Sequence, residues 1–234
     1  MTGDQMIVMP SNNKKMEVGY MAGKYPGRVG HLYAPGGYPA TPYGDWLPYA
    51  LDNGMFGAFL KTQEFGKTQR EWWPEHDFDR MVAQMCSFSQ KPRWIVVPDC
   101  VCDPGETLRM WAEFAPKLRK YGVPLAIAVQ DGMTVADVPG DADVVFVGGS
   151  TEWKWCYFDV WPRAGFRTHV GRVNSYRYLV DCHKAGIESV DGTGWFRGDQ
   201  KQVRGLRAYL EQAANDNFGP EQMTLFQATE FSNV

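Results

Sequence analysis

Residues 93–132 read "RWIVVPDCVCDPGETLRMWAEFAPKLRKYGVPLAIAVQDG" and contain two short apolar runs on either side of a helical pattern. The helix is predicted to begin after Asp103 as N-cap, with Pro104 in the first helical position, and to end at Gly122. Glu106 has the spacing of a capping box. Buried runs that alternate with helices imply parallel strands, so this segment predicts a strand, a crossover helix and a second strand.

Six further apolar runs bounded by turn residues repeat the pattern of residues 93–99 and 125–132. They span residues 6–13, 30–37, 48–54, 143–150, 167–174 and 187–194. Helical spacing fills residues 174–186 and 199–216, while residues 62–92 are predicted to hold one helix, and residues 21–30 and 38–46 to form loops. Eight strand and helix units in a chain of this length predict an α/β fold of the (β/α)8 TIM-barrel type. A doubly wound open sheet would use similar units, so the prediction depends on the strand count.

Length and composition favour one large domain over two small ones, since 234 residues with 44% hydrophobic content can bury one substantial core. We expect the barrel to occupy residues 1–218 and a tail to occupy residues 219–234. The sequence has no apolar run of 18 or more residues and lacks the basic-then-apolar start of a signal peptide. These features predict a soluble, cytoplasmic protein.

Metal and disulfide chemistry find little support in the sequence. The five cysteines are scattered and form no CxxC pair, which argues against a disulfide framework and a zinc ribbon. We expect neither a metal nor another cofactor. The net charge of -3 also argues against a generally basic nucleic-acid-binding surface, so any phosphate binding is expected to be local.

Polar residues or glycines end most of the predicted strands. In parallel α/β folds, this edge is where active sites are built. Any one of them is more often a loop-capping residue, but a set at equivalent positions favours a site. The residues are Asp52, Asp99, Gln130, Gly148, Gly149, Arg172 and Asp191.

Three carboxylates at one barrel mouth suggest either a divalent metal or chemistry at an acetal-type carbon. A metal site would normally include histidine or more oxygens, and His169 is the only plausible imidazole. A lone strand histidine is more often a core residue, or one that supports a site residue, than a ligand. The second option needs one ionised nucleophile and one carboxyl that exchanges protons. Gln130 and the backbone of Gly148 and Gly149 would then recognise a flat, hydrogen-bonding ligand.

Five segments, in order along the chain, resemble motifs of the tRNA-guanine transglycosylase superfamily. "YALDNGMF" is similar to the family's Asp-Ser-Gly-Gly-Phe segment, "VVPDCVCD" to its strand ending in Asp-Glu-Cys, and "AVQDG" to its Gln-Gln-Gly. "VFVGGS" resembles its Val-Gly-Gly-Leu, and "HVGRVNSYRYLVDCHKAGIESVDGTGWFR" resembles its Met-Gly-Val-Gly, helix and Gly-Val-Asp segment. Together they span residues 48–197.

The departures from that family concern zinc and two residues of the first motif. Only a few residues separate Asp191 from the last predicted helix, so the zinc subdomain inserted there in the family is absent, and Asn53 and Met55 replace the serine and second glycine. A compact form without zinc more closely resembles the DpdA-like phage and bacterial DNA guanine transglycosylases. This branch exchanges guanine for a 7-deazaguanine such as preQ0, and a phage origin would place the protein in the host cytoplasm.

The resemblance implies a role for each site residue. Asp191 would attack C1′ of a guanosine nucleotide and expel guanine, with Asp52 in proton transfer and base placement. Such an enzyme is a pentosyltransferase that forms a covalent glycosyl-enzyme intermediate and needs no ATP. The residues that would bind the base are Asn53, Asp99, Gln130, Gly148 and Gly149.

The implied partner is DNA with a flipped or single-stranded guanine, because the chemistry cannot occur inside a base stack. Four basic residues that follow strand ends could hold its phosphates: Arg172, Arg197, Lys14 and Lys15. For the two lysines, a solvated loop is an equally good interpretation. The alternatives are a tRNA-guanine transglycosylase and a non-catalytic barrel that binds a base or nucleic acid.

The tail contains "QMTLF" at residues 222–226, which resembles the Gln-x-x-Leu-Phe peptide that docks on replicative sliding clamps. Gln222, Leu225 and Phe226 would make the contact. The alternative is a tail that packs Leu225 and Phe226 on the barrel.

Overall fold

The computed structural model describes residues 5–11, 16–41, 44, 46–192, 194–195 and 200–215. Its strands form one parallel sheet in the order β1-β8-β7-β6-β5-β4-β3-β2. Parallel bridges from Val8 to Val29 and from Ser11 to Leu32 connect β1 with the β2 side, so the sheet closes into a barrel. The strands are β1 (Ile7–Pro10), β2 (His31–Tyr33), β3 (Tyr49–Leu51), β4 (Ile95–Val96), β5 (Leu125–Val129), β6 (Val144–Val147), β7 (Arg167–Val170) and β8 (Ser189–Gly192).

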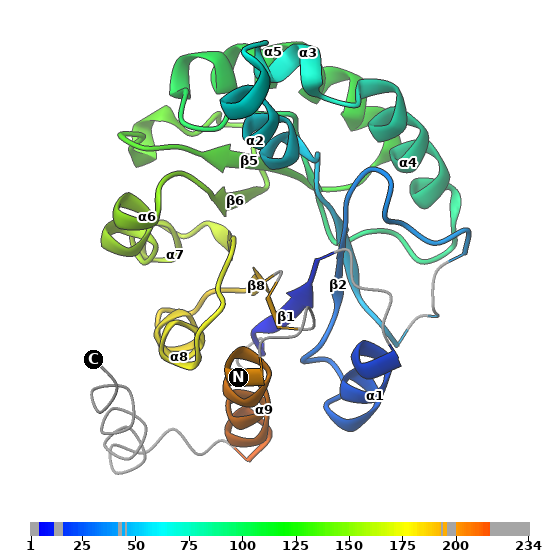
Figure 1. Ribbon diagram of the computed structural model, residues 1–234, viewed down its shortest axis with the longest axis vertical. Helices are drawn as coiled ribbons and strands as arrows, with labels where there is room; N and C mark the ends of the chain where they lie inside the picture. The colour runs from blue at the N-terminus through cyan, green and yellow to red at the C-terminus, as the bar shows by residue number, and fades with distance from the viewer. Residues whose placement is uncertain are drawn as a thin grey trace.

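Helices surround the strands as an outer layer (Figure 1). They alternate with the strands along the chain except between β2 and β3, where no helix is described, and short helices extend several of the connections. The elements are α1 (Met16–Lys24), α2 (Met55–Phe65), α3 (Gln69–Trp72), α4 (Glu75–Ser87), α5 (Pro104–Leu118), η1 (Arg119–Tyr121), η2 (Val135–Asp137), α6 (Thr151–Tyr157), α7 (Val160–Arg163), α8 (Tyr176–Lys184) and α9 (Gln200–Ala214).

The predicted (β/α)8 barrel is confirmed, and every strand lies inside one of the eight predicted runs. The Asp103 side chain accepts a hydrogen bond from the Glu106 backbone N–H (2.9 Å), which is the predicted helix start. Gly122 follows η1 in the left-handed conformation at φ 64°, which explains the predicted stop.

Two predictions for the first half of the chain were wrong. Residues 21–24 belong to α1 rather than to a loop, because Val18, Met21 and Ala22 form a buried helical face that outweighs the nearby glycines. Residues 62–92 contain the end of α2 and two further helices rather than one. Pro74 separates α3 from α4, since the residue before a proline is disfavoured in the helical conformation, and Trp73 is extended.

Two apolar layers follow from the alternation of side chains along each strand. Outward-facing residues pack under the helices in the larger cluster. Inward-facing residues fill the barrel with Ile7, Met9, Leu32, Ala50, Trp94, Val96, Ala126, Ala128 and Val144, against which Phe146 packs. Polar inward-facing side chains such as Asp191 therefore lie at the carboxyl ends of the strands, beyond this filled layer.

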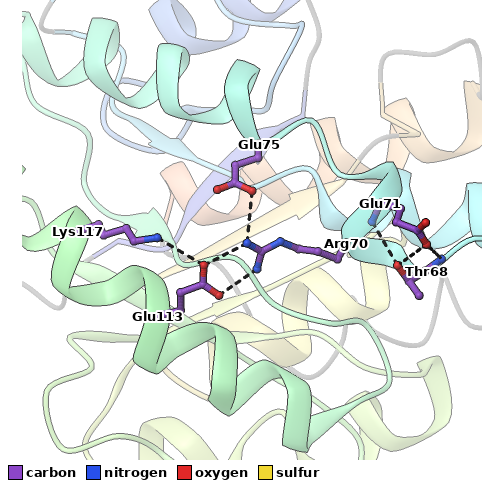
Figure 2. Close-up of polar contacts among 6 residues, drawn as sticks. All are labelled: Thr68, Arg70, Glu71, Glu75, Glu113 and Lys117. Atoms are coloured by element: carbon purple, nitrogen blue, oxygen red, sulfur yellow. Dashed lines mark hydrogen bonds and ion pairs between the residues drawn. The ribbon is translucent and has the colours of Figure 1, made fainter.

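The region around α3 is held by a surface ion network (Figure 2). Arg70 pairs with Glu113 of α5 (3.1 Å) and with Glu75 of α4 (3.4 Å), and Thr68 and Glu71 form a capping box at the start of α3. These side chains are about half exposed, so each pair contributes little to stability alone. Just after α3, the buried Trp73 indole donates to the Asn53 carbonyl (2.8 Å), which connects this region to the end of β3.

Several expectations lie outside the described residues. These are the predicted phosphate contacts Lys14, Lys15 and Arg197 and the tail residues Gln222, Leu225 and Phe226. Among the helices that the structure does describe, none has the length and apolar character needed to span a bilayer.

Candidate active site

A cavity of about 400 Å³ opens at the carboxyl ends of the strands. The strand-end residues predicted from the sequence are brought together around it from β3, β4, β5, β6, β7 and β8. The predicted residues that line the cavity are Asp52, Asn53, Asp99, Gln130, Gly148, Gly149, Arg172 and Asp191.

Asp191 lies in β8 and is 5% exposed. Its Oδ1 accepts a hydrogen bond from the Arg172 backbone N–H at 3.0 Å and lies 3.3 Å from His169 Nε2. Within the described part of the chain, both contacts are made to Oδ1. The carboxylate is therefore held by one oxygen, which leaves Oδ2 available to a ligand.

His169 in β7 is fully buried in the barrel interior, with its ring between Phe146 (centroids 4.7 Å apart) and Trp94 (4.8 Å). Its Nδ1 lies 2.8 Å from the Ser189 hydroxyl. Because an Nε2–H is needed to donate to the Asp191 carboxylate, the consistent arrangement has Nδ1 accepting from Ser189. His169 thus lies in the core and supports the Asp191 carboxylate, the two roles expected for a lone strand histidine.

The turn between β7 and α8 positions the amide that holds Asp191. Arg172 has a φ of 59°, in the left-handed region that side chains other than Asn, Asp and His seldom adopt. A Cβ at Gly171 would lie 2.9 Å from the Phe146 ring and 3.2 Å from Asp191 Oδ1, so only glycine fits there without displacement. This turn therefore stores backbone strain beside the candidate nucleophile.

Asp99 is the centre of a buried amide and carboxylate cluster. Asn53 Nδ2 donates to Asp99 Oδ1 (2.7 Å) and to the Val97 carbonyl (3.0 Å), and Gln130 Nε2 donates to Asp99 Oδ2 (2.8 Å). The Cys102 backbone N–H donates to Gln130 Oε1 (3.0 Å). Each Asp99 oxygen retains acceptor capacity, so the cluster can receive N–H groups of a flat ligand.

The two remaining carboxyls of the site have raised pKa values. Burial, followed by the charges of Asp191 and Asp99, raises the pKa of Asp52 to about 7. Burial raises the pKa of Asp99 to about 6, although the hydrogen bonds from Asn53 and Gln130 oppose this. At neutral pH, Asp52 is therefore divided between its acid and its base form, which suits proton exchange.

The second glycine of the pair after β6 also has a structural role in its own turn. Gly149 has a φ of 69°, and a Cβ there would lie 2.3 Å from Asp131 Oδ1. Asp131 accepts from the Ser150 backbone N–H at 2.6 Å. This turn and the close Asp131 carboxylate therefore require glycine at position 149, and the predicted contact of its backbone with a ligand stays a prediction.

The Arg172 side chain crosses the cavity mouth. Its guanidinium donates to the Gly149 carbonyl and lies 4.7 Å from the centre of the Phe56 ring. Phe56 and Leu60 of α2 also line the cavity and are partly exposed. The sequence interpretation missed both, because only a helix after Asn53 places them at the mouth and that helix was not predicted.

No group of three or more His, Cys, Asp or Glu side chains is placed to hold a metal ion among the residues that the structure describes. Of the three cavity aspartates, Asp99 is engaged on both oxygens by the side-chain amides of Asn53 and Gln130. The described geometry thus offers hydrogen-bonding and carboxylate chemistry.

No family model matches the sequence, and no curated protein matches it. Solved structures do match. A KGPDC from Streptococcus mutans has a TM-score of 0.50 at 9% identity, covering 92% of this chain and 100% of that one. A tryptophan synthase alpha chain from Legionella pneumophila has a TM-score of 0.50 at 10% identity, covering 92% and 94%. A phosphoribosyl anthranilate isomerase from Thermus thermophilus has a TM-score of 0.47 at 11% identity, covering 90% of this chain and 99% of that one.

The two structures matched at a TM-score of 0.50 show a (β/α)8 barrel and overturn the family assignment made from the motifs. Those two structures are a KGPDC and a tryptophan synthase alpha chain, not tRNA-guanine transglycosylases, and membership of that superfamily was therefore a wrong prediction. The reason is physical: the motifs are short strand ends, and the barrel itself demands several of their residues. Gly149 and Gly171 are examples, since backbone geometry and steric contact require glycine at each.

Proposed function

We propose that this barrel is an enzyme that exchanges guanine in DNA for a 7-deazaguanine through a glycosyl-enzyme bond to Asp191. The observation that carries the proposal is the anchoring of Asp191 through Oδ1 by the described residues, in a cavity that also contains Asp52 with a pKa of about 7. A fixed nucleophile beside a proton-exchanging carboxyl is what displacement at a glycosidic carbon requires.

In the first half-reaction, Oδ2 of Asp191 forms a bond to C1′ while the bond from C1′ to N9 of guanine breaks. The electron pair of that bond goes to the base, which takes a proton from Asp52. Once Asp191 is esterified, its negative charge no longer raises the pKa of Asp52, so loss of the proton becomes easier. Formation of the Asp191 ester therefore favours transfer of the Asp52 proton to the departing base.

In the second half-reaction, the incoming base gives its N9 proton to Asp52 and its nitrogen attacks C1′. The bond from C1′ to Asp191 breaks, which regenerates the carboxylate. Two displacements at one carbon retain the anomeric configuration, and the balance requires neither ATP nor an oxidant.

The Asp99 cluster supports recognition of guanine over adenine. The N1–H and exocyclic amine of guanine are donors on one edge, which matches the two Asp99 oxygens, and Gln130 Nε2 can donate to O6. Adenine offers an acceptor at N1, which would face the carboxylate unpaired. A buried polar mismatch of this kind costs about 1–3 kcal/mol.

DNA is proposed as the substrate polymer, with the target guanine flipped or unpaired so that it can enter the cavity. A cavity of about 400 Å³ lies in the range of small-ligand sites, so it suits one nucleoside rather than a duplex. Arg172, whose guanidinium lies over the Phe56 ring at the mouth, would meet a flanking phosphate.

Exchange of radiolabelled guanine into nucleic acid tests the proposal. The wild-type protein is incubated with single-stranded DNA, duplex DNA or tRNA, first with radiolabelled guanine and separately with a 7-deazaguanine. The nucleosides of the second set are then analysed by mass spectrometry for the incorporated 7-deazaguanine. We expect incorporation into single-stranded DNA that depends on Asp191. Incorporation only into tRNA would show that tRNA, and not DNA, is the substrate polymer. Binding to a polymer without base exchange would indicate a non-catalytic barrel.

A further inference from the structure

Lys154 of α6 is a lysine in the protein interior, 1% exposed, directly beneath the turn that carries Arg172. Its ammonium donates to the Gly171 carbonyl at 2.5 Å and lies 5.3 Å from the centre of the Trp155 ring. No carboxylate forms an ion pair with it among the described residues. Burying an ammonium without such a partner is costly, so an apolar residue would serve packing better.

The single carbonyl that Lys154 binds belongs to the turn that orients Asp191. Gly171 precedes Arg172, whose left-handed backbone directs its N–H at Asp191 Oδ1. A bond to the Gly171 carbonyl fixes the orientation of the peptide plane between these two residues, and that plane contains the Arg172 N–H. Lys154 and Asp191 are thus connected through one rigid peptide group.

We propose that Lys154 is a positioning residue that holds the Gly171–Arg172 peptide so that the Arg172 amide binds Oδ1 of Asp191 and leaves Oδ2 for attack. This inference depends on the proposed function for its kinetic consequence, but its geometric part stands independently. Without Lys154, the strained Arg172 would relax from positive φ, and the carboxylate would lose its strongest described contact.

The charges around Lys154 are compatible with this role. Burial, and next the charge of Arg172, lower the pKa of Lys154 to about 8, while Asp191 and Cys182 act in the opposite direction. The ammonium form therefore predominates at neutral pH and can donate to the carbonyl.

The experiment compares single-turnover formation of the protein-DNA adduct in wild type and Lys154→Met, over a series of concentrations of a single-stranded guanine oligonucleotide. Methionine preserves length and removes the donor. We expect the rate constant at saturation to fall by about 10- to 100-fold, because a misplaced reacting group costs up to this much. The half-saturating concentration should change by less than about threefold, since base and phosphate contacts are intact.

Two controls separate positioning from packing. Thr168 of β7 is as buried as Lys154, and its hydroxyl donates to the Phe166 carbonyl (3.0 Å), away from the turn. The Thr168→Val variant, which lacks this hydroxyl, should therefore react like wild type. Lys154→Ala should regain part of its rate with added ethylamine but not with ethanol. A wild-type rate in Lys154→Met, an equal loss in Thr168→Val, or loss of affinity without rescue by the amine would each overturn the proposal.

A crystal structure of Lys154→Met gives a readout that does not require activity. The inference predicts that Arg172 leaves the left-handed region and that its N–H no longer contacts Asp191 Oδ1. If the wild type forms no adduct, the proposed function fails, and this structure still decides the inference. An unchanged turn in the variant would overturn it.

Discussion

The backbone N–H of Arg172 donates to Oδ1 of Asp191 at 3.0 Å, from a residue whose φ is 59°. The contact joins a strained turn after β7 to the carboxylate of β8. Such strain persists only where surrounding structure imposes it, and here Gly171, Lys154 and His169 surround the same pair. The turn at Arg172 and the carboxylate of Asp191 can therefore be tested by separate variants.

Arg172→Gly keeps the backbone amide and removes both the strain and the guanidinium. We expect the free energy of unfolding to stay within about 1 kcal/mol of wild type, because relief of strain offsets the lost stacking on Phe56. Affinity for single-stranded DNA should fall, and the slope of log K against log salt should decrease by about one phosphate contact. An unchanged salt slope would show that Arg172 touches no phosphate.

Asp52 is predicted to set the alkaline limb of the exchange reaction. Its acid form protonates the departing base, so the rate should fall as the pH rises through about 7. Asp52→Asn should lower the rate by about 10²- to 10⁴-fold and abolish that limb. A pH profile from 5.5 to 8.5 (about the range in which such a group titrates) checks this, and a limb that survives in the variant would assign the proton transfer to another group.

The same shift has a consequence for stability. A carboxyl with a raised folded-state pKa binds protons more tightly in the folded protein than in the unfolded chain. Asp52 therefore makes stability fall as the pH rises from about 4 to about 7, and Asp99 acts in the same direction up to about 6. Asp52→Asn should raise the free energy of unfolding at pH 8 by about 1–3 kcal/mol. Urea unfolding at acid and alkaline pH measures it; equal stability changes at both would contradict the raised pKa.

Much of the fold follows from the sequence because barrel strands are short buried runs that end in turn residues. The helix after Asp103 was predicted correctly because capping is a local interaction. Helices α1 and α2 were not predicted, since Gly19, Gly23 and Gly57 weaken the helical pattern and tertiary packing outweighs it.

The strand-end rule predicts that Asp52, Asp99, Gln130 and Asp191 lie at one edge of the barrel, and they line one cavity there. It could not find the residues whose role depends on register or on a helix. His169 contacts Asp191 because the two strands align it beside Ser189, and Lys154 reaches the turn from a seven-residue helix. Neither contact can be predicted from the spacing of residues along the sequence.

Gly149→Ala tests whether the glycine pair serves the turn. The new Cβ would meet Asp131 Oδ1 at 2.3 Å at a backbone φ of 69°, so we expect a loss of about 1–3 kcal/mol in the free energy of unfolding. Gly140→Ala is the matched control, since its Cβ would meet nothing within 4 Å. Chemical denaturation compares the two; equal, small effects would mean that the turn adapts to a side chain.

The central claim is that Asp191 forms the covalent bond to C1′, and trapping that bond tests it most directly. The protein is incubated with a single-stranded guanine oligonucleotide without incoming base, denatured and resolved on a gel, and the adduct is mapped by mass spectrometry. Asp191→Asn retains shape and most hydrogen bonds but lacks the attacking oxyanion. The account predicts an adduct on Asp191 in the wild type and none in Asp191→Asn, with base exchange reduced by several orders of magnitude. An undiminished adduct in the variant, or one mapped to Asp52, would contradict it.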